Sequence, residues 1–375
     1  MKISFIVGTR PELIKVAPLI IQFKKTNIEV DIVNTAQHKD LLDPYWNTFG
    51  LEPTHILNVM IPNQSLSALT SRSLNEIQTY IDTVNVRPDI ILAQGDTTTV
   101  MAASMICFYN QIKFAHLEAG LRSFDIYSPY PEELNRRIAS LIADFHFCPT
   151  SISKHNLINE GIPNEKIFEV GNTVVDTLEW IRANKNMNNI PYQNKALEKI
   201  SSFKKSVLVT CHRRENQGQN LLNIIDAIQK LAIRNPETIF VWAIHPNPRV
   251  KGIVSSSSLK NLKNILFTEP LEYLDVLCLM SRSFCVISDS GGIQEEAPSF
   301  KIPVIVLRET TERPEGVDMG LAFLAGADSE KILYYYKYIE QNSITFSINP
   351  YGDGASCQRI EKIILKEFMQ HDLNE

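Results

Sequence analysis

Short apolar segments alternate with amphipathic segments along the first half of the chain. The apolar segments are rich in β-branched residues, which is typical of strands buried on both faces of a parallel sheet. The amphipathic segments have the spacing of helices that cover such a sheet. The expected strands are residues 2–7, 29–37, 89–96, 112–119 and 145–150, and the helices that follow them are residues 13–25, 38–50, 97–109, 132–145 and 151–161. This pattern predicts a doubly wound α/β domain.

The same alternation restarts in the second half, after a polar, Asn-rich segment at residues 186–202 that is the best candidate for a linker. The expected strands there are residues 206–212, 238–246, 264–270, 285–290 and 303–308, with helices at 220–232, 272–281 and 358–369. A chain of 375 residues is also long for one hydrophobic core. We therefore expect two Rossmann-like domains, with ligands bound beyond the C-terminal strand ends, in the cleft that the domains share.

Composition excludes several classes of protein. Hydrophobic residues make up 44% and charged residues 21%, as in ordinary soluble proteins. The net charge of −5 leaves no basic excess for bulk nucleic-acid binding. The N-terminal apolar stretch is short for a signal peptide and no run suggests a membrane helix, so we expect a cytoplasmic protein that binds no membrane. The six cysteines form no CxxC pair and are expected to be buried thiols.

Acidic side chains stand at the ends of two expected strands and at the start of the helix expected at 132–145. These are Asp96, Glu118 and Glu132. Asp96 could merely cap a helix, and Glu132 could form an ordinary surface pair with Arg136 one turn later. Glu118 is harder to explain as a solvated carboxylate, since it follows a buried strand and has no local partner. His116 lies two residues before Glu118, but this spacing is not a familiar metal-ligand pattern, so we expect no metal.

Groups suited to a phosphate follow other expected strands. Ser290, Gly291 and Gly292 join a strand to a helix, where glycines allow close approach and the helix start attracts an anion. A plain serine cap with a glycine turn is the alternative. Glu296, one turn further on, could accept hydrogen bonds from ribose hydroxyls. Arg10 lies at the first strand-to-helix corner, where it is either a surface arginine or a diphosphate ligand.

His212 opens a basic cluster, "HRREN", directly after a strand. A histidine there could protonate a leaving phosphate, or it could belong to a solvated helix cap. No GxGxxG follows the first strand, which argues against a nicotinamide-binding domain.

Taken together, these motifs closely resemble the bacterial non-hydrolysing UDP-N-acetylglucosamine 2-epimerases. The motifs that carry the resemblance, in chain order, are "GTRPE", "QGDTTT", "HLEAGLR", "PYPEELNRR", "VGNTVVDTL", "HRREN", "HPNP" and "SDSGGIQEEA". The resemblance implies a GT-B fold with a UDP-sugar in the cleft, and usually a homodimer. It also implies that the last helix, 358–375, returns to a first domain at 1–172, and that residues 173–357 bind UDP.

The resemblance also implies roles for individual residues. The proposed acid/base carboxylates fall on Asp96, Glu118 and Glu132, the diphosphate and leaving-group contacts on Arg10, His212, Ser290, Gly291 and Gly292, and the ribose contact on Glu296. Arg136 and Arg313 lie in motifs that line the cleft. Arg72 and His245 keep a regulatory UDP-N-acetylglucosamine site possible. Asp43, Pro44 and Trp46 stand in a stretch where regulated relatives carry glutamines, which argues against such a site.

The implied reaction is reversible C2 epimerisation of UDP-N-acetylglucosamine to UDP-N-acetylmannosamine, with no cofactor. We expect anti elimination of UDP to give 2-acetamidoglucal, followed by re-addition, supplying N-acetylmannosamine for surface polysaccharide synthesis. Three alternatives stay open: a GT-B glycosyltransferase, a hydrolysing 2-epimerase that releases UDP and N-acetylmannosamine, and a non-catalytic sugar-nucleotide sensor. The motif "GTRPE" disfavours the hydrolysing enzymes, which resemble "GTRAD" at this place.

Overall fold

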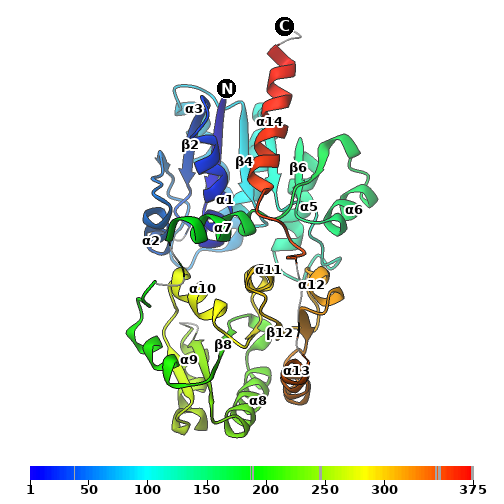
Figure 1. Cartoon of the computed structure of the whole chain (residues 1–375). Coiled ribbons are helices and arrows are strands. Elements are labelled where there is room, and N and C mark those ends of the chain that lie inside the picture. The colour runs from blue at the N-terminus through cyan, green and yellow to red at the C-terminus, as the bar shows by residue number, and fades with distance from the viewer. Residues whose placement is uncertain are drawn as a thin grey trace. The chain divides into compact units, whose positions relative to one another are not determined.

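A computed structural model describes residues 1–37, 39–185, 187, 190–244, 247–342, 344 and 348–372. The chain divides into two compact units, Met1–Trp180 with Tyr351–Glu375, and Ile181–Pro350. Each unit has one parallel sheet with helices packed on its faces (Figure 1). The predicted α/β class with two Rossmann-like domains is therefore confirmed.

The first unit is built on a seven-stranded sheet in the order β3-β2-β1-β4-β5-β6-β7. The strands are β1 Lys2–Val7, β2 Glu29–Asn34, β3 His55–Ile56, β4 Ile90–Gln94, β5 Lys113–Leu117, β6 Phe145–Cys148 and β7 Ile167–Glu169. All neighbouring strands run parallel. Because β1, β4 and β5 are neighbours, the residues that follow these strands emerge side by side at one edge of the sheet.

Helices connect these strands and cover the sheet. They are α1 Arg10–Phe23, α2 Lys39–Phe49, α3 Leu66–Thr83, α4 Thr98–Asn110, α5 Glu132–Ile142, α6 Ser151–Asn159, α7 Thr173–Lys185 and α14 Ser356–Asp372, with a short 3-10 turn at Asn164–Lys166. The last helix, α14, packs beside the first, α1 (Figure 1), and Gln22 donates a 2.8 Å hydrogen bond to Glu361. The two ends of the chain therefore belong to the same unit.

Helix α7 packs mainly within the first unit. The Thr177 hydroxyl donates to the carbonyl of Ile14 at 2.6 Å, and the Trp180 ring lies 5.3 Å from that of Phe49. The first unit therefore continues past the expected boundary at residue 172.

Residues 190–202 of the Asn-rich segment, which the structure describes, are part of the second unit and do not link the two. The backbone amides of Gln193 and Asn194 donate to the buried carboxylate of Asp275, each at 2.9 Å. A 3-10 helix follows at Lys195–Ser202. Asn-rich composition was misleading here because the backbone of the segment is held by this carboxylate.

The second unit has a six-stranded parallel sheet in the order β10-β9-β8-β11-β12-β13. The strands are β8 Lys205–Cys211, β9 Thr238–Ile244, β10 Ile265–Thr268, β11 Cys285–Ser288, β12 Val304–Val306 and β13 Ala322–Leu324. The helices are α8 Gln219–Arg234, α9 Pro248–Ser256, α10 Tyr273–Ser281, α11 Gly291–Glu296, α12 Pro314–Asp318 and α13 Ser329–Gln341, with 3-10 turns at Arg214–Asn216, Ser258–Asn261 and Ala297–Phe300. Trp242, Phe240 and Ile287 are fully buried in the core between sheet and helices.

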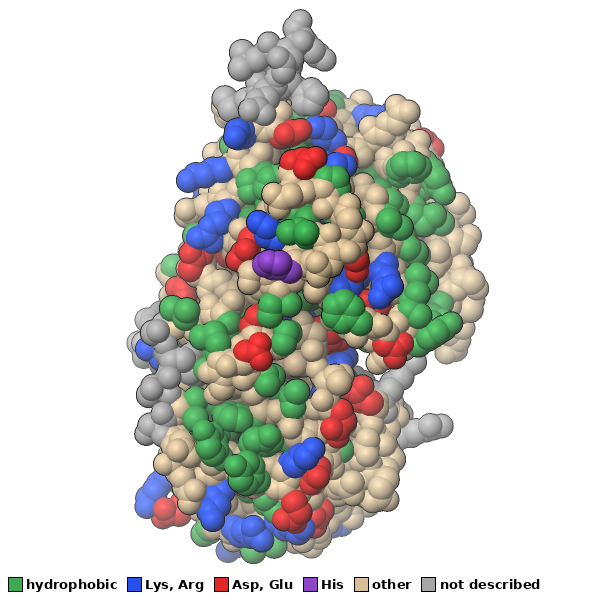
Figure 2. All heavy atoms as spheres, turned by 90° about the vertical axis from the view of Figure 1, so that its right-hand side faces the viewer, with side chains coloured by type: hydrophobic (Ala, Val, Ile, Leu, Met, Phe, Trp, Pro, Cys, Tyr) green, Lys and Arg blue, Asp and Glu red, His purple; other side chains and the backbone are tan. Residues whose placement is uncertain are grey.

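The surface shown in Figure 2 mixes charges of both signs with hydrophobic side chains and has no basic stripe. Among the helices that the structure describes, none is both long and apolar enough to cross a membrane. All six cysteines are buried and unpaired, which confirms the prediction of buried thiols. Burial raises the pKa of the Cys148 thiol to about 12.

Two histidines lie opposite each other on adjacent strands inside the first unit. His116 of β5 and His146 of β6 are in register, and both are fully buried. Burial lowers the pKa of His116 to about 4, although the ring donates a 2.7 Å hydrogen bond to the Gly95 carbonyl. Burial and the neighbouring His116 lower the pKa of His146 to about 3. Both rings are therefore neutral in the folded protein.

We predict that these histidines make the protein sensitive to acid. The pKa values of both histidines in the folded protein lie below the ordinary value of 6.5. Below pH 6.5 the unfolded chain therefore binds protons that the folded protein does not, and the free energy of unfolding falls; above pH 6.5 this loss is absent. His146→Leu should reduce the loss of unfolding free energy between pH 7 and pH 5 by about 2 kcal/mol, measured by urea unfolding. His155→Leu, at an exposed position of α6, is the control. Equal pH slopes for both variants would contradict this assignment.

Candidate active site

Acidic side chains of the first unit follow β4 and β5 and begin α5. We call Asp96, Glu118 and Glu132 the carboxylate cluster. Asp96 lies two residues after β4, Glu118 directly follows β5, and Glu132 is the first residue of α5. The predicted positions of these residues, at two strand ends and at a helix start, are confirmed.

Glu118 is buried and held in a fixed position. Its backbone has a positive φ of 63°, a left-handed conformation that few residues other than glycine adopt. Its carboxylate accepts a hydrogen bond from Gln94 at 2.7 Å and forms an ion pair with Lys15 of α1. The side chains of Lys15 and Glu118 are each only 8% exposed. A buried carboxylate next to a buried ammonium group favours its ionised form.

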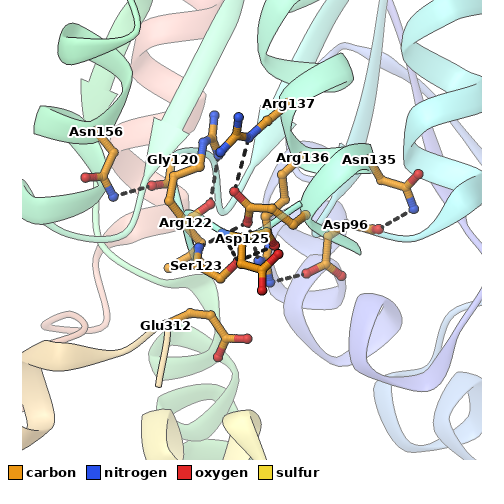
Figure 3. Close-up of polar contacts among 12 residues, drawn as sticks. Asp96, Gly120, Arg122, Ser123, Asp125, Asn135, Arg136, Arg137, Asn156 and Glu312 are labelled. Atoms are coloured by element: carbon orange, nitrogen blue, oxygen red, sulfur yellow. Dashed lines mark hydrogen bonds and ion pairs between the residues drawn. The ribbon is translucent and has the colours of Figure 1, made fainter. Parts of the chain in front are cut away.

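Asp96 is anchored by helix α5. Arg136 forms an ion pair with the Asp96 carboxylate at 2.6 Å, and the Asn135 side chain donates to the Asp96 carbonyl at 2.8 Å (Figure 3). Asp96 does not serve as the cap of α4, because Thr97 is the cap and its hydroxyl accepts the hydrogen bond from Val100. The alternative that Asp96 only caps a helix is therefore wrong.

Glu132 begins α5 and is half-buried, while its neighbour Glu133 is fully buried and structural. Glu133 accepts hydrogen bonds from the Ser123 amide at 3.1 Å and from Arg136 at 3.0 Å. It thereby ties the loop before α5 to the arginine that holds Asp96. The tandem glutamates have different roles, which the sequence alone does not separate.

Arg10 is the first residue of α1, and its side chain is exposed with the guanidinium 5.8 Å from the ring of Tyr45. The corner that carries Arg10 is organised by Glu12. This buried carboxylate accepts hydrogen bonds from the amides of Gly8 at 2.6 Å and Thr9 at 3.0 Å, as in a capping box. Burial raises the pKa of Glu12 to about 7, although these hydrogen bonds oppose the shift.

In the second unit, His212 follows β8 and is paired with a buried aspartate at the end of β11. The Nδ1 atom of His212 lies 2.8 Å from Asp289, whose side chain is fully buried. Asp289 also accepts the amides of His212 and Arg213, each at 2.9 Å, and the side chain of Asn216. Burial alone would raise the pKa of Asp289, but His212 and the amide hydrogen bonds lower it to about 2. The carboxylate thus fixes the position of the His212 ring.

Two arginines lie at the start of α11: Arg213 donates to the Asp289 carbonyl at 2.9 Å, and Arg313 lies over Gly291. With Arg308, whose charge acts on Arg213, they form what we call the arginine corner. Ser290 is the N-cap of α11, yet its hydroxyl makes no capping hydrogen bond, so the plain serine cap is not observed. Arg313 forms an ion pair with Glu295 at 2.6 Å, and burial together with the charge of Arg308 lowers the pKa of Arg213. Gathered guanidinium groups at a helix start are suited to an anion.

Glu296 is the last residue of α11. It is 7% exposed and accepts a 2.8 Å hydrogen bond from the hydroxyl of Tyr273. Of the two residues predicted as regulatory, Arg72 is in α3, where it donates to Gln64 at 2.7 Å, and His245 lies outside the described residues. In the described part of the chain, no group of three or more metal-binding side chains could hold a metal ion.

Sequence reasoning missed Lys15, Asp289 and Tyr273. Lys15 does carry a signal, because it interrupts the apolar face of α1 between Ile14 and Val16. Asp289 stands in a predicted strand directly before Ser290, where a buried acid needs partners. Tyr273 has no such signal, since a tyrosine at the start of an apolar helix is ordinary.

Comparisons with known proteins agree on one family. A family model described as UDP-N-acetylglucosamine 2-epimerase matches residues 22–365. The UDP-N-acetylglucosamine 2-epimerase of Salmonella typhimurium is 41% identical over 369 residues, which is 96% of this chain and 97% of that protein. A crystal structure of the Neisseria meningitidis UDP-GlcNAc 2-epimerase bound to UDP-GlcNAc has a TM-score of 0.89 and 40% identity, covering 98% of this chain and 100% of that one.

The fold by itself is less specific. The glycotransferase of kitacinnamycin has a TM-score of 0.58 but only 10% identity, covering 96% of this chain and 93% of that one, so it shares only the fold. The family match, together with about 40% identity over nearly the whole chain, therefore favours the epimerases over the glycosyltransferases. On this evidence the chain belongs to the UDP-N-acetylglucosamine 2-epimerase family.

Proposed function

We propose that this epimerase interconverts UDP-N-acetylglucosamine and UDP-N-acetylmannosamine without releasing the free sugar. Membership of the family supports the substrate. The observation that carries the chemistry is the buried Glu118 carboxylate, paired with Lys15, in the same unit as Asp96 and Glu132. Such a group is shielded from water and lies beside a positive charge, as suits a base that accepts a proton from carbon.

Inversion at C2 requires loss of a hydrogen that is barely acidic. If the C1–O bond to UDP breaks, positive charge develops at C1 and acidifies the C2 hydrogen. A carboxylate then takes this proton while the C1=C2 double bond of 2-acetamidoglucal forms. Re-addition of UDP at C1, with a proton delivered to the opposite face of C2, gives the epimer. Two faces require two proton-transfer groups, and the carboxylate cluster supplies three.

Loss of UDP requires stabilisation of the departing diphosphate. His212, held by Asp289 at Nδ1, would present its other nitrogen to the phosphate as an acid. In the same unit as His212, Arg313 and the start of α11 would stabilise the growing negative charge. The same groups would retain UDP for re-addition, and this retention separates the proposed reaction from hydrolysis.

Gly291 is central to the proposed diphosphate site because Arg313 lies directly over it. A Cβ atom at Gly291 would lie 2.7 Å from the guanidinium carbon of Arg313, whereas one at Gly292 would lie 3.9 Å from the hydroxyl oxygen of Ser290. The missing side chain therefore lets the guanidinium group reach the start of α11. Arg313 in turn is fixed by Glu295 at 2.6 Å.

The product would supply N-acetylmannosamine for surface polysaccharide synthesis. We also propose a homodimer, since Phe108, Tyr109 and Leu141 place exposed apolar side chains on the neighbouring helices α4 and α5. Light scattering should then give twice the 42.6 kDa mass of the chain, and a mass of one chain would argue against the dimer.

Incubation with UDP-N-acetylglucosamine alone tests the function. We expect UDP-N-acetylmannosamine as the product by proton NMR, with no acceptor added. Glu118→Gln and Glu132→Gln should each lower kcat by about 10³-fold or more, because each removes a proton-transfer group. Glu52→Gln, an exposed glutamate of the same unit, should leave kcat unchanged.

Other products would reject the proposal. Free N-acetylmannosamine with UDP would indicate the hydrolysing reaction, and unchanged substrate would favour a transferase or a sensor. Full activity of either Gln variant would remove that residue from the mechanism.

The fit of Arg313 over Gly291 is tested by a pair of alanine substitutions. Gly291→Ala should lower the free energy of unfolding by about 1–3 kcal/mol, since its methyl group collides with a guanidinium fixed by an ion pair. Gly292→Ala should cost nothing or stabilise α11 by up to about 1 kcal/mol, because the space is open. Thermal unfolding without ligand measures both, and equal effects would show that Arg313 yields easily.

A further inference from the structure

The backbone that carries Asp96 is fixed by side chains from other elements of the first unit. Gly95, directly before it, has a left-handed φ of 87°, and its carbonyl accepts a 2.7 Å hydrogen bond from Nε2 of the buried His116. The carbonyl of Asp96 itself accepts a 2.8 Å hydrogen bond from the side chain of Asn135 (Figure 3). Two successive carbonyl groups of this turn are therefore held by buried donors.

Asn135 belongs to the same helix as a second member of the carboxylate cluster. Glu132 and Asn135 are three residues apart in α5 and Arg136 follows, so the three side chains lie on one side of the helix. Asn135 is 3% exposed and Arg136 is 5% exposed. Arg136 holds the carboxylate of Asp96 at 2.6 Å, while Asn135 holds its backbone. The helix that begins with Glu132 thereby fixes Asp96 at two points.

We propose that Asn135 is a positioning residue for Asp96, which it holds at the place where the C2 proton of the sugar is transferred. The inference rests on the proposed function, which gives Asp96 a part in proton transfer. A carboxylate that exchanges a proton with carbon must lie within hydrogen-bond distance of that proton. A misplacement of about 1 Å can lower the rate by about a hundredfold. Arg136 orients the end of the side chain, and Asn135 fixes the main chain from which the side chain extends.

A double-mutant cycle tests this role, with epimerisation of UDP-N-acetylglucosamine followed by proton NMR. Asn135→Ala should lower kcat about tenfold or more and change KM less than about threefold, because Asn135 acts on a proton-transfer group and not on the UDP moiety. In the Asp96→Asn background the same substitution should lower kcat by less than about threefold, since the carboxylate that Asn135 positions is already gone. Asn135→Leu keeps the branched shape without the amide donor and should behave like Asn135→Ala.

Asn156→Ala is the matched control. The side chain of Asn156 in α6 donates to the carbonyl of Gly120 at 2.9 Å, so it also joins a helix to a loop that follows a strand (Figure 3). Gly120 has no side chain to take part in the proposed reaction, and kcat should stay within about threefold of the wild-type value. Thermal unfolding of every variant reports its stability, so a fall in kcat at equal stability separates positioning from general destabilisation.

The outcomes separate the inference from the function on which it rests. Equal losses of kcat from Asn135→Ala in the wild-type and Asp96→Asn backgrounds would show that Asn135 acts independently of Asp96, and the inference would be wrong while the epimerase stands. An unchanged kcat for both Asn135 variants would reject it as well. Full activity of Asp96→Asn would remove Asp96 from the mechanism, and the inference with it. Absence of epimerisation by the wild-type protein would reject the proposed function itself.

Discussion

The chemistry that we propose for the first unit depends on a buried ion pair, Lys15 with Glu118. A carboxylate that takes a proton from carbon must be shielded from water, and burial without a partner would raise its pKa and neutralise it. Lys15 of α1 supplies the compensating positive charge, and Gln94 at the end of β4 donates a hydrogen bond to the same carboxylate. Loss of one partner from a buried pair typically costs about 3–5 kcal/mol, because the other charge is left uncompensated. The pair can form only because β1, β4 and β5 are neighbours in a parallel sheet, which brings α1 and the end of β5 to one edge.

Buried carboxylates also organise the loops of both units. Each accepts hydrogen bonds from backbone amides that would otherwise lack partners: Glu12 at the start of α1, Glu133 before α5, Asp176 at the start of α14, Asp275 in the Asn-rich segment and Asp289 after β8. These loops therefore have a defined shape without regular secondary structure. Two of the five, Glu12 and Asp289, lie next to residues that we assign to substrate, Arg10 and His212. Preorganised positions of this kind lower the cost of stabilising a transition state.

Sequence patterns predict the sheets well because parallel strands buried on both faces are nearly continuous apolar runs. Short edge strands escape such a pattern: β3, β7 and β13 have two or three residues each. Helices α3 and α13 were also missed, because their apolar positions are separated by many polar or tyrosine residues. Candidate site residues were found where a motif or a strand end marks them, as for Asp96 and His212. The partners Lys15, Asp289 and Tyr273 were not, since each acts through a residue far away in sequence and only the fold brings the two together.

Deuterium incorporation at C2 tests the central claim, that protein carboxylates remove and return the C2 proton, most directly. The wild-type protein is incubated with UDP-N-acetylglucosamine in D2O, and the sugar is followed by proton NMR. The account predicts that UDP-N-acetylmannosamine forms without its C2 proton signal, because the proton removed by a carboxylate exchanges with solvent before re-addition. Formation of the epimer with its C2 proton fully retained would contradict the account, since inversion would then proceed without proton transfer to the cluster.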